Sequence, residues 1–128
     1  MSLNQLLYAK EKYKIVDYEV PEELDFFEHG FGLSKENDPD EGLFSYCYQY
    51  KDGKNLIFSH SPSVENSLSV KLTSDEDVIF YLSQEGVRSI TFQAWEDEKI
   101  IRVYLNHKSN KELRISYNPK PKLYFSEF

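Results

Sequence analysis

Few residues of this 128-residue chain have the types and spacing that chemistry requires. The single cysteine, Cys47, lies in an alternating segment, where a small buried side chain is its usual role. The three histidines, His29, His60 and His107, are far apart and share no metal-ligand spacing such as His-x3-His. We therefore predict that the chain is not an enzyme and has no catalytic residue, metal site or cofactor. The alternative, an enzyme centred on His60 or Cys47, would need a cleft with a neighbouring carboxylate.

Known phosphate and calcium motifs do not fit the sequence either. The five glycines are scattered singly, and none forms GxGxxG or GxxxxGK[ST]. Residues 37–42 superficially resemble an EF-hand loop, but Pro39 falls where a ligand belongs, and Tyr48 falls where the bidentate Glu should be. The sequence therefore argues against an EF-hand and leaves a weak, nonspecific cation site in this loop as the alternative.

The whole net charge of −7 lies in one stretch, Pro21 to Glu41. This stretch contains eight acidic residues and one lysine, and the rest of the chain contains 14 acidic and 14 basic residues. A charge excess gathered in one segment is a better candidate for a contact surface than the same excess spread evenly. The acidic residues of this stretch are Glu22, Glu23, Asp25, Glu28, Glu36, Asp38, Asp40 and Glu41.

The second half of the stretch predicts a partner-binding surface, made by Glu36, Asp38, Asp40 and Glu41 with Phe31 beside them. Aromatic anchors next to charge are typical of interfaces. The predicted function is a small acidic protein-binding domain, of the inhibitor or immunity type, that occludes a basic partner protein such as a toxin or nuclease. Size, acidity and predicted build resemble bacterial toxin-immunity proteins in general, although no family motif is matched.

Two other interpretations stay open. Residues 99–128 carry seven basic and two acidic residues, so the acidic stretch could lie against its own basic strands. Alternatively, the chain could be a small-ligand-binding or regulatory module with an aromatic-lined pocket. The residues expected to line that pocket are Tyr46, Tyr48, Tyr50, Phe58 and Trp95.

Composition narrows the range of partners and compartments. A pI near 5.0 argues against nucleic acid or an anionic membrane as the main partner, because both attract clustered Lys and Arg. No apolar run approaches the length of a transmembrane helix, and residues 1–8 lack the features of a secretion signal. We expect a cytoplasmic protein. An apolar tail at residues 123–128 is expected to dock on its own domain or on a second copy in a homodimer.

The elements that must position these residues are mostly strands. Residues 43–50 alternate strictly, with Phe44, Tyr46, Tyr48 and Tyr50 on one face, and Asp52-Gly53 follows as a hairpin turn. Further strands are expected at residues 13–20, 56–59, 67–73, 88–95, 99–106 and 112–117, and Pro119 and Pro121 should end regular pairing.

Helices are expected at residues 3–12 and 75–85, and a short one is expected to begin at Pro21 and end at Gly30, with Leu24 and Phe27 on its inner side. Between Gly32 and Gly42 the sequence predicts an irregular acidic loop. The prediction is one domain, residues 1–128, of the α+β class. Its antiparallel sheet of about five to seven strands should have one or two helices packed on one face.

Overall fold

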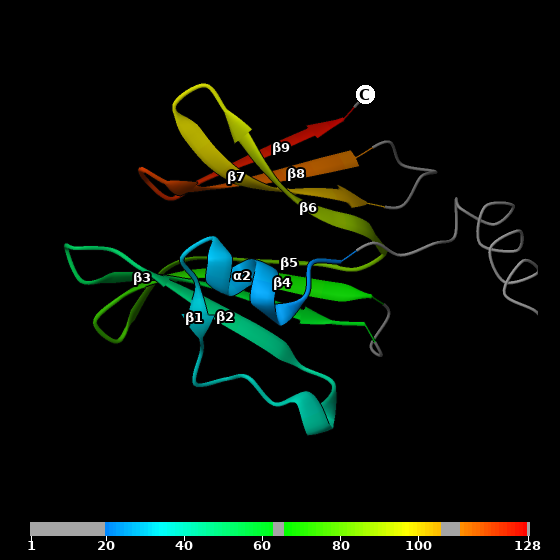
Figure 1. The fold of residues 1–128 in the computed structure, drawn as a ribbon, viewed down its shortest axis with the longest axis horizontal. Coiled ribbons are helices and arrows are strands. Elements are labelled where there is room, and N and C mark those ends of the chain that lie inside the picture. Colours follow the sequence, from blue (N-terminus) through cyan, green and yellow to red (C-terminus); the bar gives the residue numbers. More distant parts are fainter. Residues whose placement is uncertain (1–19, 63–65, 106–110, 128) are drawn as a thin grey trace, which may run out of the picture.

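The computed structural model describes residues 20–62, 66–105 and 111–127, in which two antiparallel sheets face each other (Figure 1). The first sheet has the order β1-β2-β3-β4-β5, with bounds Gly32–Leu33, Phe44–Gln49, Lys54–Ser61, Ser67–Ser74 and Asp77–Gln84. The second has the order β6-β7-β8-β9, with bounds Val87–Trp95, Glu98–Leu105, Lys111–Asn118 and Lys122–Glu127. A six-residue helix, α2 (Glu23–Glu28), and a 3-10 turn, η2 (Pro39–Glu41), are the helical elements described.

The expected α+β class is therefore wrong. The inward faces of the two sheets cover each other, so neither sheet needs a layer of helices. The shared core joins Leu56, Phe58 and Val70 of the first sheet to Val103 and Ile115 of the second. The strands expected at residues 99–106 and 112–117 are confirmed as β7 and β8. Their alternate, inward-facing residues are 0–4% exposed and comprise Ile101, Val103, Leu105, Leu113, Ile115 and Tyr117.

The helix expected at residues 75–85 is a strand, β5. Asp75 and Glu76 form the two-residue connection of a hairpin, because Ser74 pairs with Asp77 across it. The β-branched and aromatic run Val-Ile-Phe-Tyr that follows favours a strand. Val78 and Ile79, which a helix would have placed on its apolar face, are 55% and 50% exposed.

Pairing does not end at Pro119 and Pro121, contrary to expectation. These prolines lie in the connection between β8 and β9, and the tail returns as an antiparallel edge strand. Leu123 pairs with Ile115, and Phe125 pairs with Leu113. The tail therefore docks on its own sheet. Phe125 at this edge is 49% exposed.

The hairpin at Asp52-Gly53 is confirmed. Gly53 has a φ of +90°, and its N–H donates to the carbonyl of Tyr50 over 3.1 Å. The turn sets the register in which Tyr46 pairs with Phe58, so both rings point into the core.

Helix α2 closes one side of the sandwich and buries a single ring. Phe26 is 1% exposed, whereas Leu24 and Phe27, the expected inner residues, are 64% and 42% exposed. The ring of Phe26 lies 5.6 Å from that of Phe58 and 5.0 Å from that of Phe92, measured between centroids, so it contacts both sheets. In so short a helix one such contact decides which side faces inward. The elements expected at residues 3–12 and 13–20 lie outside the described residues, apart from Val20.

Candidate functional site

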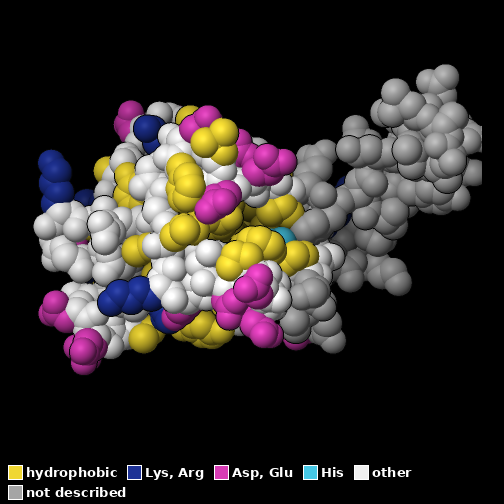
Figure 2. Space-filling view, turned by 60° about the horizontal axis from the view of Figure 1, so that its bottom comes forward, with side chains coloured by type: hydrophobic (Ala, Val, Ile, Leu, Met, Phe, Trp, Pro, Cys, Tyr) yellow, Lys and Arg dark blue, Asp and Glu magenta, His cyan; other side chains and the backbone are white. Residues whose placement is uncertain are grey.

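A groove of about 520 Å³ opens between the start of α2 and the segment that precedes β2. Its lining consists of Val20, Pro21, Glu22, Glu23, Phe26, Asn37, Pro39, Phe44, Tyr46, His60 and Pro62. Figure 2 shows the face of the molecule on which hydrophobic side chains gather with acidic side chains around them. An apolar hollow with acidic edges is the most distinctive surface feature of the described chain.

The sheet register supplies one side of the groove. Phe44 and Tyr46 lie on the inward face of β2, and His60 of β3 pairs with Phe44. His60 is 4% exposed, and burial lowers the pKa of its imidazole to about 4. A histidine with this pKa is neutral at pH 7 and adds no positive charge to the groove.

The α2 wall carries two carboxylates. Glu22 and Glu23 follow Pro21, and the backbone N–H of Glu22 donates to the Asp25 carboxylate over 2.8 Å, which fixes the start of the helix. Burial, together with the charge of Glu23, raises the pKa of the Tyr46 hydroxyl. The Glu23 carboxylate is thus close enough to the aromatic lining to act on it electrostatically.

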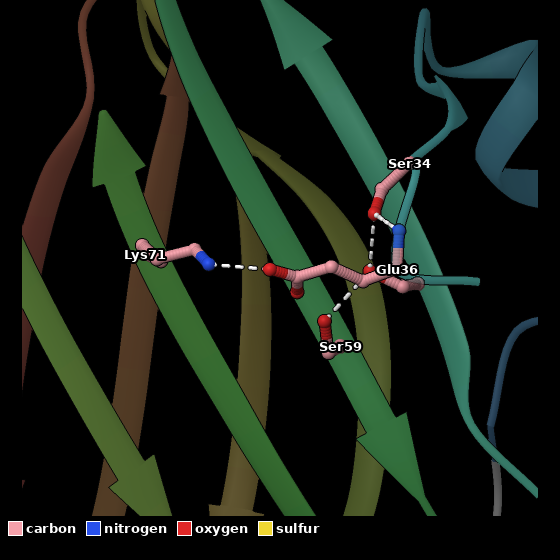
Figure 3. Close-up of polar contacts among 5 residues, drawn as sticks. Ser34, Glu36, Ser59 and Lys71 are labelled. Atoms are coloured by element: carbon pink, nitrogen blue, oxygen red, sulfur yellow. Dashed lines mark hydrogen bonds and ion pairs between the residues drawn. The ribbon is translucent and has the colours of Figure 1, made fainter. Parts of the chain in front are cut away.

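The opposite wall is the segment Ser34–Gly42, and buried hydroxyls tie it to the first sheet (Figure 3). The Ser45 hydroxyl donates to Ser34 Oγ over 2.8 Å and lies 2.7 Å from Ser59 Oγ. The N–H of Ser45 donates to Asn37 Oδ1 over 2.9 Å. All three serines are at most 9% exposed, so these bonds are shielded from water.

Glu36 extends from this wall across the sheet and pairs with Lys71 of β4, as Figure 3 shows, with 2.5 Å between Nζ and Oε1. Backbone hydrogen bonds within the segment hold the rest of the wall. Asp38 and Leu43 exchange backbone hydrogen bonds of 2.9 and 3.0 Å, and Gly42 ends η2 with a φ of +75°. The wall is therefore a hydrogen-bonded turn, where the sequence predicted an irregular loop.

The structure separates the predicted partner-binding residues into three groups. Asp38, Asp40 and Glu41 are exposed and make no ion pair with any described residue. Glu36 is neutralised by Lys71. Phe31 is 3% exposed and packs in the core against Tyr48 and Tyr117, so its ring supports the fold from inside.

The basic C-terminal strands do not neutralise the acidic stretch within the described residues. Arg102 and Arg114 of the second sheet instead pair with Glu112 beside them, which is fully buried. Lys122 pairs with Glu98, also in that sheet. The acids of the groove therefore face solvent without an internal counter-charge among these residues.

Sequence reasoning counted Glu22 and Glu23 in the acidic stretch but left them out of the predicted partner-binding residues, and so missed the α2 wall. A signal for it is present: each wall contains a proline followed by two acidic residues, Pro21-Glu22-Glu23 and Pro39-Asp40-Glu41. The two triplets lie 18 positions apart, and the fold brings the first triplet and Pro39 of the second to the same groove.

The two residues considered for catalysis are on opposite faces of their sheet. His60 pairs with inward-facing Phe44, whereas Cys47 lies between inward-facing Tyr46 and Tyr48 and points outward. Burial raises the pKa of the Cys47 thiol, which disfavours the reactive thiolate. The part of the chain that the structure describes holds no group of three His, Cys, Asp or Glu side chains that could bind a metal ion. His107 lies outside that part.

The aromatic pocket expected from sequence does not form as one cavity. Tyr46 lines the groove, and Tyr48 lines a second hollow of about 490 Å³ on the other side of α2. Trp95 lies on the second sheet, under the guanidinium groups of Arg102 and Arg114. None of the helices described is long and apolar enough to cross a membrane.

Comparison with known proteins identifies the fold. No protein family and no curated protein matches the sequence. The structure is similar to a chain of the contact-dependent growth inhibition toxin–immunity protein complex from Klebsiella pneumoniae 342. The TM-score is 0.72 with 21% sequence identity, and the match covers 85% of this chain and 96% of that one. At this identity the likeness establishes a shared fold.

Proposed function

We propose that the chain is an immunity-type protein, which binds a toxin-type protein partner and occludes it without catalysis. The observation that carries the proposal is the groove, whose acidic edges have no counter-charge among the described residues. Such edges attract the Lys and Arg of a partner and repel phosphate, so they favour the inhibitor over a nucleic-acid-acting toxin. The fold shared with a chain of a toxin–immunity complex supports the same role.

The proposed partner is basic, and a nuclease toxin is the class that fits best. Proteins that act on nucleic acid gather Lys and Arg around the site that holds the phosphates. Carboxylates placed over that site would both steer association and exclude substrate. Asp38, Asp40 and Glu41 are suited to steering because they are exposed on a fixed turn. We further propose that binding takes place in the cytoplasm.

The test is protection of growing cells. The reading frames next to this gene would be expressed from an inducible promoter, with and without the full chain. We expect one of them to stop growth, this chain to restore it, and the two proteins to purify as a complex. Absence of a toxic neighbour, or a toxic neighbour that this chain neither binds nor neutralises, would contradict the proposal.

A small apolar ligand is the second candidate, because the groove volume lies within the range of about 300–1,000 Å³ typical of ligand pockets. Native mass spectrometry of the purified full chain tests this candidate. A bound mass that is lost on denaturation would support it, and the mass of the bare chain would count against it.

A further inference from the structure

The groove has an aromatic surface and carboxylates at its edge, and a single side chain can contact both. Phe44 and Tyr46 offer aromatic rings, and Glu22 and Glu23 offer carboxylates at the edge of the same hollow. An arginine side chain has an aliphatic stem and a planar cation that both stacks on rings and bonds carboxylates in pairs. Lysine matches the charge but lacks the planar group that stacks.

The charge of the lining is consistent with a cationic guest. Its two carboxylates have no ion-pair partner among the described residues, and the lining contains no Lys or Arg. Asp40 and Glu41, which follow Pro39 in the sequence, are exposed and lie outside the lining. A cation in this hollow would meet the carboxylates of the α2 wall.

The lining is also held in place before any partner arrives. Pro21, Pro39 and Pro62 restrict the backbone at three points of the edge. The Phe26 ring stacks on Tyr46, and a hydrogen bond from the Ser45 N–H to Asn37 Oδ1 holds the opposite wall. A preformed site spends little free energy on ordering its own side chains.

We infer that the groove receives one arginine side chain of the toxin-type partner. Its stem lies against the partly exposed ring of Phe44, and its guanidinium meets the carboxylate of Glu23. This inference rests on the proposed function and adds to it the residue type that anchors the complex. Arginine is among the residue types that dominate binding energy at interfaces, which suits a single deep contact of this kind.

The direct test uses a small probe, so that it does not depend on identifying the toxin. The ¹⁵N-labelled full chain would be titrated with N-acetyl-arginine amide, followed by two-dimensional NMR. N-acetyl-citrulline amide, which has nearly the same shape without the charge, is the matched control probe. We expect the amides of Phe44 and Tyr46 to shift with the arginine probe, with a dissociation constant of roughly 1 mM, and to stay in place with citrulline.

Substitutions of single carboxylates identify the one that binds the arginine probe. Glu23→Gln should weaken binding of the arginine probe by about threefold or more, whereas Glu23→Asp should retain most of it. Glu28→Gln, at the far end of the same helix and outside the groove lining, should leave binding unchanged. A dispersed spectrum for each variant shows that it is folded.

Three outcomes would overturn the inference: equal shifts with both probes, shifts confined to another face, or no shift with either probe. These outcomes leave the growth test intact. If the chain protects cells and Glu23→Gln protects equally well, the proposed function stands and the arginine contact falls. If arginine binds but the chain neither binds nor neutralises a neighbouring toxin, the arginine site stands and the proposed function falls.

Discussion

The ring of Phe26 stacks on the ring of Tyr46, with centroids 3.9 Å apart and planes 6° from parallel. Phe26 belongs to α2 and Tyr46 to β2, so this stack attaches the helix that carries Glu22 and Glu23 to the first sheet. The position of one acidic wall of the groove thus depends on the packing of a single aromatic side chain, Phe26. Stability and binding should respond together when it is removed.

Phe26→Ala should lower the free energy of unfolding by about 3–5 kcal/mol, because it leaves a cavity among four aromatic rings. Phe27→Ala, one position later and 42% exposed, should change it by less than about 1 kcal/mol. Urea unfolding followed by circular dichroism measures both. Equal losses would mean that the helix faces the core with the other ring.

This pair also shows where sequence reasoning succeeds and where it fails. The alternation of β2, β7 and β8 predicts their inward faces correctly, because each strand buries one face along its whole length. A helix of six residues has no such repetition, so nothing in the sequence tells Phe26 from Phe27. Only the distance to Tyr46 decides between them.

The sequence prediction for β5, a helix, was wrong for a related reason. As an edge strand it leaves Val78, Ile79 and Tyr81 exposed, so its apolar residues do not report burial and also fit a helical stripe. The acidic loop was predictable as a charged surface, because charge density is visible in sequence. Its partner wall at Glu22 and Glu23 was not, because it depends on how β1 folds back along β2.

The serine hydroxyls behind the loop should stabilise it measurably. Ser45→Ala removes the hydroxyl that bridges Ser34 and Ser59 and leaves two buried hydroxyls with fewer partners. We expect a loss of about 1–3 kcal/mol in the free energy of unfolding. Faster amide hydrogen exchange at Glu36 and Asn37 should accompany it. Unchanged exchange there would show that the loop is held by other contacts.

Glu112 should contribute far more to the free energy of unfolding than the more exposed Glu98 of the same sheet. It is 0% exposed, accepts a hydrogen bond from Arg102, and lies 3.1 Å from Arg114 Nε. Glu112→Ala leaves two partly buried guanidinium groups without their anion, which should cost about 3 kcal/mol of unfolding free energy. Glu98→Ala, which breaks the exposed pair with Lys122, should have a much smaller effect. Thermal unfolding compares the two, and similar losses would contradict the predicted role of Glu112.

His60 should make stability depend on pH. Burial lowers its folded-state pKa to about 4 from the ordinary 6.5, so below pH 6.5 the unfolded chain binds a proton that the folded chain does not. The contribution of His60 to the free energy of unfolding is complete above pH 6.5. It falls as the pH drops toward 4, by about 2–4 kcal/mol in all.

Urea unfolding of the full chain between pH 7 and pH 4.5 measures this dependence. The difference between the wild type and His60→Gln isolates the histidine from the carboxylates that titrate nearby. A slope that survives His60→Gln would assign the pH dependence to another group.

The central claim is that the exposed acids of the turn beside the groove steer a basic protein partner, and the association rate tests it most directly. Stopped-flow mixing with the toxin at low and high salt would compare the wild type with Asp40→Lys/Glu41→Lys. The control, Glu76→Lys/Asp97→Lys, makes the same charge change in the β4–β5 and β6–β7 turns at the other end of the sheets (Figure 1).

We predict that the loop variant associates about tenfold or more slowly at low salt, and that the difference shrinks as salt screens the charges. The control variant should stay within about twofold of the wild type, because its charges lie at the other end of the sheets, away from the proposed contact. A loop variant that associates at the wild-type rate at low salt would contradict the claim.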